Sequence, residues 1–324
     1  MKINAVIGAG QLGSRHLQGL LRLTIKQKIF VLDPSEVSLE VSKSRANEIP
    51  NEHEIIFSTD WDVLPKNLDL VIIATGANVR SMLIEKLLPK YKLENLVLEK
   101  ILFQDLKSYE KIGKLLKQTN THTWVNHPRR TAIHFSEVRD TIANSKEKVN
   151  FNIVGSNWGL ACNALHFIDI ISYIANASIR SIDLDWIDPV IHESKRANNI
   201  ELTGSIKGIL SNGSNFVINS IDGEFEDVSL FIASNTQRWI IQEGRAQKII
   251  HLSSANGFNP IISDIQIEYQ STITTRIASD LFESGNCNLP TYEQACESHI
   301  PFIEAILKKY IEISGVETTI CPIT

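Results

Sequence analysis

The chain has 324 residues, of which 43% are hydrophobic and 21% charged, a mixture typical of a globular protein with about two domains. With 32 Lys and Arg against 37 Asp and Glu, the formal net charge is −5. That balance argues against nucleic-acid and membrane-surface partners, since both need a concentrated basic face. The four cysteines form no C-x-x-C pair, so neither a metal site nor a disulfide framework is expected. No signal peptide and no membrane span are recognisable, so we expect a cytoplasmic protein.

The first third of the chain alternates short apolar runs with amphipathic segments. The runs predict buried strands at 3–7, 29–32, 55–57, 70–74, 96–98 and 124–125. Between the first two runs, Leu12, Leu17, Leu20 and Leu21 share one helical face. Strands that alternate with helices indicate parallel βαβ units. We therefore predict an α/β protein whose residues 1–122 form a Rossmann domain with a doubly wound parallel sheet.

The pattern changes after about residue 127. Helices are predicted at 131–143, at 159–179 and at 261–284, and strands at 149–154, 179–186, 200–210, 215–221, 228–234 and 238–242. Asn212-Gly213 and Asp222-Gly223 are hairpin-type turns, which favour a mainly antiparallel sheet. Thr291 and Gln294 form a capping-box pattern at the start of the last helix. Residues 123–324 are thus expected to form an α+β substrate-binding and oligomerisation domain on an open sheet, with last helices that can pack back on the first domain.

The first predicted strand ends in a glycine motif. Gly8-Ala9-Gly10-Gln11-Leu12-Gly13 matches GxGxxG, where the glycines permit a tight turn and bring a pyrophosphate close to a helix N-terminus. Asp33 follows the second strand, twenty residues after Gly13. A carboxylate there can accept hydrogen bonds from a ribose and repel a 2′-phosphate, which favours NAD over NADP. The alternative is a glycine turn that only packs a helix, followed by an Asp-Pro turn.

Polar residues also follow the later strands of the first domain. In an open parallel sheet the ligand lies beyond the carboxyl ends of the strands, so these residues should line one edge. In addition to Gly8, Gly10, Gln11, Leu12, Gly13 and Asp33, the predicted cofactor-binding residues are Thr75, Gly76, Asn78, Glu99, Lys100 and His127. NAD is the expected cofactor, and NADP remains possible because Arg15 or Ser35 can modify the choice.

Several of these segments resemble the glucose–fructose oxidoreductase / inositol dehydrogenase family (Gfo/Idh/MocA). The similar segments are Gly8–His16, Asp69–Asn78, Glu99-Lys100-Ile101, His166-Phe167-Ile168-Asp169, Glu201–Gly204 and the region from Leu289 to His299. The resemblance implies NAD(P)-dependent chemistry at a hydroxyl or carbonyl carbon, usually of a sugar or cyclitol. It further implies that Lys100 contacts the nicotinamide ribose and the substrate, and that His166 is the acid/base. It also implies dimer contact through the open sheet, so a homodimer or a dimer of dimers is expected.

The two catalytic candidates can also be weighed from the residues. Lys100 ends an apolar strand, where partial desolvation lowers a lysine pKa and suits proton transfer; the alternative is a lysine that only pairs with Glu99. His166 lies in a polar stripe with Cys162, Asp169 and Tyr173 on a buried helix. A histidine there exchanges protons readily, but it could instead be a core residue satisfied by Asp169.

The chain departs from the family pattern at two positions. Cys162 stands where many of these dehydrogenases have an Asp that orients the histidine, and Ile101 replaces the Pro of the Glu-Lys-Pro motif. Arg129, Asn157, Trp158 and Asn163 are the predicted substrate-binding residues.

The function that these patterns favour is hydride transfer between nicotinamide and a hydroxyl or carbonyl carbon of a sugar, sugar acid or nucleotide sugar in carbohydrate metabolism. Two alternatives stay open. One is a lyase or hydrolase that keeps NAD tightly bound and oxidises its substrate transiently. The other is a non-catalytic nucleotide-binding protein.

Overall fold

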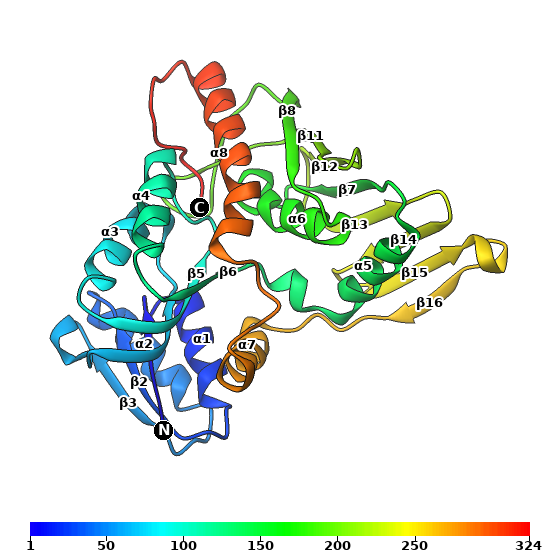
Figure 1. Cartoon of the computed structure of the whole chain (residues 1–324). Coiled ribbons are helices and arrows are strands. Elements are labelled where there is room, and N and C mark those ends of the chain that lie inside the picture. Colours follow the sequence, from blue (N-terminus) through cyan, green and yellow to red (C-terminus); the bar gives the residue numbers. More distant parts are fainter. The chain divides into compact units, whose positions relative to one another are not determined.

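A computed structural model describes all 324 residues, and its chain divides into two compact units (Figure 1). Unit 1 comprises Met1–Phe103, Lys107–Pro128 and Glu268–Ala295. Unit 2 comprises Gln104–Leu106, Arg129–Ile267 and Cys296–Thr324. Among the helices, none combines the length and the apolar character needed to span a bilayer.

Unit 1 is built on a six-stranded sheet in which every pair of neighbours is parallel. Its strands are β1 (Lys2–Ile7), β2 (Gln27–Leu32), β3 (Glu54–Ser58), β4 (Asn67–Ile73), β5 (Lys92–Glu99) and β6 (His122–Asn126). The order β3-β2-β1-β4-β5-β6 reverses between β1 and β4, as in doubly wound dinucleotide-binding sheets. The predicted Rossmann sheet is confirmed, because the apolar runs of the sequence are these strands.

The helices of unit 1 are α1 (Gln11–Leu21), α2 (Glu36–Ala46), α3 (Ala77–Leu87), α4 (Leu106–Leu116) and α7 (Gln270–Ser284), with a short 3-10 helix at Trp61–Val63. Side chains of α1, α2 and α7 share one core with alternate residues of the sheet. Figure 1 shows α7, which comes from late in the sequence, beside α1. Gly19 permits this approach, since an added Cβ would lie 2.5 Å from the Ser271 carbonyl oxygen.

Unit 2 is built on an eight-stranded sheet in the order β16-β15-β14-β13-β7-β12-β11-β8. The strands are β7 (Asn150–Ser156), β8 (Ile179–Ile187), β11 (Gly204–Leu210), β12 (Asn215–Ile221), β13 (Glu226–Ala233), β14 (Gln237–Gln242), β15 (Lys248–Ser253) and β16 (Ile261–Asp264). All neighbours are antiparallel except β7 and β12. The mainly antiparallel sheet is confirmed.

One face of this sheet is buried and the other is open. Phe216 and Ile218 of β12 and Trp239 of β14 point into the core. On the opposite face, the register aligns Lys207, Val217, Asn152, Phe231, Ile240, Ile250 and Ile262 in one row across the strands. The remaining helices are α5 (Ile133–Ser145), α6 (Leu160–Ala175) and α8 (Tyr292–Ser314), with 3-10 turns at Pro128–Thr131 and Ser254–Asn256.

Several local predictions for the second half were wrong. The predicted helix at 261–284 starts only at Gln270, because the β-branched pair Ile261-Ile262 forms edge strand β16 against β15, a strand that the sequence did not suggest. The single run at 200–210 is broken at Gly204, whose φ is +102°, into β11 and the two-residue strand β10 (Ile200–Glu201), which pairs with β9 (His192–Glu193).

The two predicted hairpins have different outcomes. Asn212-Gly213 does join paired strands, β11 and β12. Asp222-Gly223 does not form a hairpin, because β7 lies between β12 and β13 and pairs with both. The predicted capping box of the last helix is confirmed, since Gln294 N donates to Thr291 Oγ1 at 3.3 Å and Thr291 N donates to Gln294 Oε1 at 3.2 Å.

Candidate functional site

The glycine loop after β1 leaves room beside the start of α1. Gly8 has a φ of +97°, which favours glycine. An added Cβ at Gly13 would lie 1.7 Å from the Gly8 carbonyl oxygen, so only glycine lets α1 begin this close to β1. Gly10 is the N-cap of α1 and supplies no side-chain cap. No heavy atom lies within 4 Å of a Cβ built there. The positive end of α1 is therefore uncapped and open to an anion.

Asp33, at the carboxyl end of β2, braces this loop. Its Oδ2 accepts from Ala9 N at 2.7 Å and its Oδ1 accepts from Ser35 N at 2.8 Å. Each carboxylate oxygen can accept more than one hydrogen bond, so Asp33 can hold the loop and still receive a hydroxyl. Bracing the loop is a role that the sequence did not suggest.

Arg45 of α2 holds the first turn of α1. Its guanidinium donates to Gln11 Oε1 and to Ser14 Oγ, both at 2.6 Å, and to the Gln11 carbonyl oxygen at 3.3 Å. The side chain of Gln11 is thus tied to α2 across the glycine loop. Leu12 is half-buried on the same turn.

The second predicted cofactor loop follows β4. Thr75 ends the strand region, and Gly76 is the N-cap of α3 with no side-chain cap. A Cβ at Gly76 would lie 2.8 Å from Asn78 Oδ1, so the loop folds tightly over its own helix start. The uncapped starts of α1 and α3 thus follow two neighbouring strands, β1 and β4.

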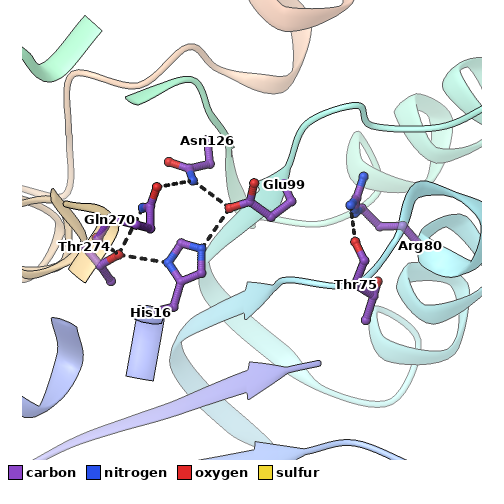
Figure 2. A network of polar contacts seen from close by, with 7 residues as sticks. All are labelled: His16, Thr75, Arg80, Glu99, Asn126, Gln270 and Thr274. Carbon is purple, nitrogen blue, oxygen red and sulfur yellow. Dashed lines mark hydrogen bonds and ion pairs between the residues drawn. The ribbon is translucent and has the colours of Figure 1, made fainter. Parts of the chain in front are cut away.

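Arg80 ties the second loop to the end of β5. Its side chain is buried, and its guanidinium donates to the carbonyl oxygens of Ile101 and Leu102, the latter at 2.9 Å. It also donates to the Thr75 carbonyl oxygen (Figure 2). One guanidinium thus ties the loop after β4 to Ile101 and Leu102, the two residues that follow Lys100. No sequence motif singled out Arg80.

A buried hydrogen-bond network lies at the carboxyl ends of β5 and β6 (Figure 2). His16 Nε2 is 2.8 Å from Glu99 Oε1, and His16 Nδ1 is 2.9 Å from Thr274 Oγ1. Asn126 Nδ2 donates to the same Glu99 oxygen at 2.6 Å and to Gln270 Oε1 at 3.1 Å. The network joins α1, β5, β6 and α7, so segments more than 250 residues apart in the sequence meet at this edge.

The charge of Glu99 is stabilised by its neighbours. Burial by itself would raise the pKa of the Glu99 carboxyl. The hydrogen bond and charge of His16, the hydrogen bond from Asn126 and the charge of Arg80 outweigh burial and hold that pKa below its ordinary value. Glu99 is therefore a buried carboxylate with acceptor oxygens only.

Lys100 and His127 directly follow this network in the chain. Lys100 is half-buried after β5, and its peptide bond to Ile101 is cis. His127 is buried after β6, and its backbone N–H donates to the Val125 carbonyl oxygen at 2.8 Å. All twelve predicted cofactor residues thus belong to unit 1, at the carboxyl ends of β1, β2, β4, β5 and β6.

His166 lies half-buried on α6, in unit 2. Glu201 of β10 provides the cap that Gly159 cannot, because its Oε2 accepts from Ala161 N at 2.9 Å. Burial raises the pKa of Glu201. Cys162, one turn before His166, directs its Sγ to the Ile200 carbonyl oxygen at 3.7 Å. A carboxylate thus does contact the start of α6, but it comes from β10 and not from position 162.

Two ion pairs occupy the arginines of this region. Arg130 donates to both oxygens of Asp169, at 2.7 and 2.8 Å, deep in unit 2. Asp169 is therefore paired with Arg130 in the interior of unit 2. Arg129, a predicted substrate residue, donates to both oxygens of Glu243, at 2.7 to 3.1 Å.

The other predicted substrate residues surround the turn before α6. Trp158 is buried and donates from Nε1 to the Asn219 carbonyl oxygen at 2.8 Å. Asn163 donates to the Trp158 carbonyl oxygen at 3.0 Å, and Asn157 donates to the Gly223 carbonyl oxygen. These three side chains therefore stabilise one turn together.

Sequence reasoning missed the side chains that support the candidate site. They are His16, Arg45, Arg80, Glu243, Gln270 and Thr274. Only the position of His16, three residues after Gly13, hinted at an inward-facing residue of α1. A cavity of about 650 Å³ lies at the other end of the sheet, where it is lined by Leu21, Arg22, Leu23, Thr24, Lys26, Ile49, Pro50, Asn51, Glu52 and His53. None of the predicted site residues lines it.

Comparison with known families matches residues 3–127 to the oxidoreductase family with an NAD-binding Rossmann fold, Gfo/Idh/MocA. The match covers the six-stranded sheet and the glycine loop of unit 1. It confirms the resemblance and identifies an NAD-binding Rossmann domain. Among curated proteins, no sequence matches the chain.

Solved structures share the fold across nearly the whole chain. An oxidoreductase from Agrobacterium radiobacter, in complex with NAD+, L-tartaric acid and magnesium, is 13% identical with a TM-score of 0.70, over 95% of this chain and 96% of that one. UDP-N-acetylglucosamine 3-dehydrogenase from Acidithiobacillus ferrooxidans is 11% identical with a TM-score of 0.66, over 94% and 96%. The transcriptional regulator Gal80p from Kluyveromyces lactis is 14% identical with a TM-score of 0.72, over 96% and 92%. At these identities the likeness shows the fold alone.

Proposed function

Residues 3–127 belong to the oxidoreductase family with an NAD-binding Rossmann fold, and on that premise we propose that the whole chain is an NAD-dependent dehydrogenase or reductase. Its proposed substrate is a small polar molecule of the sugar, sugar acid or nucleotide sugar class. Two of the structural neighbours are described by such chemistry, one with tartaric acid and one as a nucleotide-sugar dehydrogenase.

The observation that carries the proposal is the open space at Gly10. Gly10 leaves the N–H groups at the start of α1 without a side-chain cap and open to a ligand, and a pyrophosphate needs close approach to such groups. Asp33 supports binding of the adenosine half of NAD, because its carboxylate lies at the end of β2 and holds the glycine loop by accepting from Ala9 N. Its negative charge favours a ribose with a free 2′-hydroxyl over a 2′-phosphate.

The catalytic roles are assigned to Lys100 and His166. When bound, nicotinamide accepts or donates the hydride at the carbon that carries the substrate oxygen. Lys100 donates a hydrogen bond to that oxygen, which stabilises the charge that develops on it. His166 takes the hydroxyl proton in oxidation and returns it in reduction. Asp169 supports this role indirectly, since its pairing with Arg130 fixes the core under α6.

The substrate side of the proposal rests on Arg129, Asn157, Trp158 and Asn163. Because Arg129 already pairs with Glu243, the pair presents both donors and acceptors to a ligand and no uncompensated positive charge. Such a pair suits the hydroxyls of a sugar better than a phosphate. We therefore favour neutral polyols and sugars within the proposed class.

A second candidate function is a non-catalytic NAD-binding protein. The sulfur at Cys162, where many family dehydrogenases carry an Asp, favours it, and so does the likeness in fold to a transcriptional regulator. Binding of NAD without turnover of any substrate would select this candidate. A lyase or hydrolase with tightly bound NAD is the third, and turnover without net NADH would select it.

The assembly is proposed to be a homodimer or a dimer of dimers in the cytoplasm. The open face of the unit 2 sheet supports the assembly, because Trp186, Ile209, Ile221, Phe231 and Ile262 all lie on it and each is at least 40% exposed. An apolar patch of this kind is typical of a protein interface.

The test of the catalytic roles compares Lys100→Met and His166→Ala with the wild type. His166→Ala should bind NADH as the wild type does, whereas Lys100→Met should bind it more weakly because it also loses the expected contact to the nicotinamide ribose. Both variants should lose about 10²- to 10⁴-fold in hydride transfer, the range of a general acid–base contribution. Hydride transfer is followed by the nicotinamide absorbance. Full activity of His166→Ala would remove His166 from the role.

A further inference from the structure

The amide of Asn126 is held in one orientation by its neighbours. Its nitrogen lies 2.6 Å from Glu99 Oε1 and 3.1 Å from Gln270 Oε1 (Figure 2). A carboxylate oxygen has no proton to give, so Asn126 must present its NH2 group to Glu99. Reversing the amide would place its oxygen against two other oxygens.

The orientation of Gln270 is fixed in the same way. Thr274 Oγ1 donates its only proton to the Gln270 backbone oxygen at 2.8 Å and accepts from Gln270 Nε2 at 3.2 Å. The side-chain oxygen of Gln270 is therefore the atom that faces Asn126. Both protons of the Asn126 nitrogen are thus used within the protein.

The Asn126 side-chain oxygen is left as a buried acceptor. Asn126 is only 2% exposed, and no protein group donates to its Oδ1. In Figure 2 this oxygen points away from Glu99. Burying an acceptor without a donor costs about 1–3 kcal/mol, and a donor supplied by a ligand at this edge would remove that cost.

The position of Asn126 indicates which donor that is. The strand order reverses between β1 and β4, so a dinucleotide at this edge places its adenosine half toward β2 and its nicotinamide half toward β5 and β6. Asn126 ends β6 directly opposite Glu99 of β5. A ribose hydroxyl can donate or accept, whereas the carboxamide NH2 of nicotinamide only donates, and this site offers only an acceptor.

We propose that Asn126 is a cofactor-positioning residue whose Oδ1 accepts an N–H from the nicotinamide carboxamide, with His16 and Glu99 holding the amide in the orientation that this requires. The inference rests on the proposed function, since it places the nicotinamide half of NAD at this edge. It adds a residue that neither the GxGxxG motif nor the comparisons single out. It also assigns the His16–Glu99 pair a role in cofactor binding, because the pair orients Asn126.

Calorimetric titration with NAD+ and with 3-acetylpyridine adenine dinucleotide tests the assignment, because the acetyl analogue lacks the carboxamide N–H. The wild type should bind the analogue about fivefold more weakly than NAD+, the worth of one neutral hydrogen bond. Asn126→Ala should bind NAD+ about fivefold more weakly than the wild type and should not distinguish the two compounds. ADP-ribose, which lacks the nicotinamide, should bind both proteins equally and shows that the variant is folded.

Asn4→Ala is the matched control, since Asn4 is also buried, also has an Oδ1 without a protein donor, and lies in the middle of β1 away from the carboxyl end. It should keep the wild-type ratio between the two dinucleotides. The inference is overturned if Asn126→Ala keeps that ratio. It is also overturned if Asn126→Ala binds ADP-ribose and NAD+ more weakly by the same factor, which would assign the contact to the ribose. A wild type that binds neither NAD+ nor ADP-ribose would contradict the proposed function as well.

Discussion

His16 and Glu99 form a buried pair, with 2.8 Å between His16 Nε2 and Glu99 Oε1 and side chains that are 2% and 7% exposed. The pair links the first helix of the dinucleotide-binding unit to the strand that ends at Lys100. Buried pairs of this kind contribute little net stability, but losing one partner is costly because the other charge is left uncompensated. The pair therefore couples the stability of unit 1 to the position of Lys100.

Glu99→Gln should destabilise the protein in a pH-dependent way. The pKa of Glu99 is lowered in the folded protein from its ordinary value of 4.5. Its carboxylate therefore stabilises the fold above that value, and this contribution is lost as the pH falls through the lower pKa of the folded state. We expect a loss of the order of 3 kcal/mol at neutral pH and a smaller difference from the wild type below pH 4.5.

Urea unfolding of both proteins, followed at neutral and acid pH, measures this difference. Glu94→Gln is the control, because Glu94 lies on the same strand but its side chain is 54% exposed. Its one ion pair is weak, with 3.9 Å between Glu94 Oε2 and Lys2 Nζ. The control should change the free energy of unfolding by less than about 0.5 kcal/mol. A difference between wild type and Glu99→Gln that does not vary with pH would contradict the assigned ionisation.

Gly10→Ala and Gly13→Ala should separate binding from folding. Gly10 has an ordinary φ of −67° and an open surrounding, so alanine fits the protein but occupies the space proposed for the pyrophosphate. We expect unchanged stability and at least about tenfold weaker NAD binding, or 1.4 kcal/mol. Gly13→Ala should lose about 1–3 kcal/mol of stability because its Cβ collides with the Gly8 carbonyl.

Thermal unfolding and calorimetry applied to both variants test this pair. If Gly10→Ala binds NAD with wild-type affinity, the pyrophosphate does not lie at the start of α1.

Asp33→Asn should weaken the preference for NADH. Asn keeps an oxygen that can accept from Ala9 N but removes the charge that repels a 2′-phosphate. Fluorescence titration should show a clear NADH preference in the wild type and a preference about tenfold smaller in the variant, since a hydrogen bond to a charged group is worth about 1.5–3 kcal/mol. Equal binding of NADH and NADPH by the wild type would contradict the role of Asp33.

Phe231→Glu should dissociate the proposed dimer. Phe231 is 40% exposed on the open face of the unit 2 sheet, where a carboxylate would be desolvated in an interface. Light scattering should report a dimer or larger species for the wild type and a monomer for the variant. Met82→Glu, a change at a residue 61% exposed on α3, should leave the mass unchanged. A monomeric wild type would rule out this assembly.

The parts of this molecule that the sequence predicts are those with local causes. The glycine loop, the strands of unit 1 and the capping box at Thr291 each depend on residues within a few positions of one another. The Gly8–Gly13 spacing predicts the turn because Gly13 must pack on the Gly8 carbonyl itself.

The parts that the sequence does not predict depend on distant partners. The role of Asn126 follows from Gln270, which lies 144 residues away, and His16 meets Thr274 at a separation of 258 residues. Strand β16, which was predicted as the start of a helix, pairs with β15 at the edge of the sheet. The insertion of β7 between β12 and β13 is likewise invisible in a turn signal such as Asp222-Gly223.

The measurement that tests the central claim most directly is turnover of NAD+ by the purified wild type with a panel of sugars, polyols and sugar acids. The proposal predicts that at least one compound yields NADH and that His166→Ala, loaded with the same cofactor, yields it about 10²- to 10⁴-fold more slowly. A protein that binds NAD+ but neither reduces it with any alcohol nor oxidises NADH with any corresponding ketone would contradict the dehydrogenase assignment. It would leave the two other candidates, a non-catalytic NAD-binding protein and a lyase or hydrolase with tightly bound NAD.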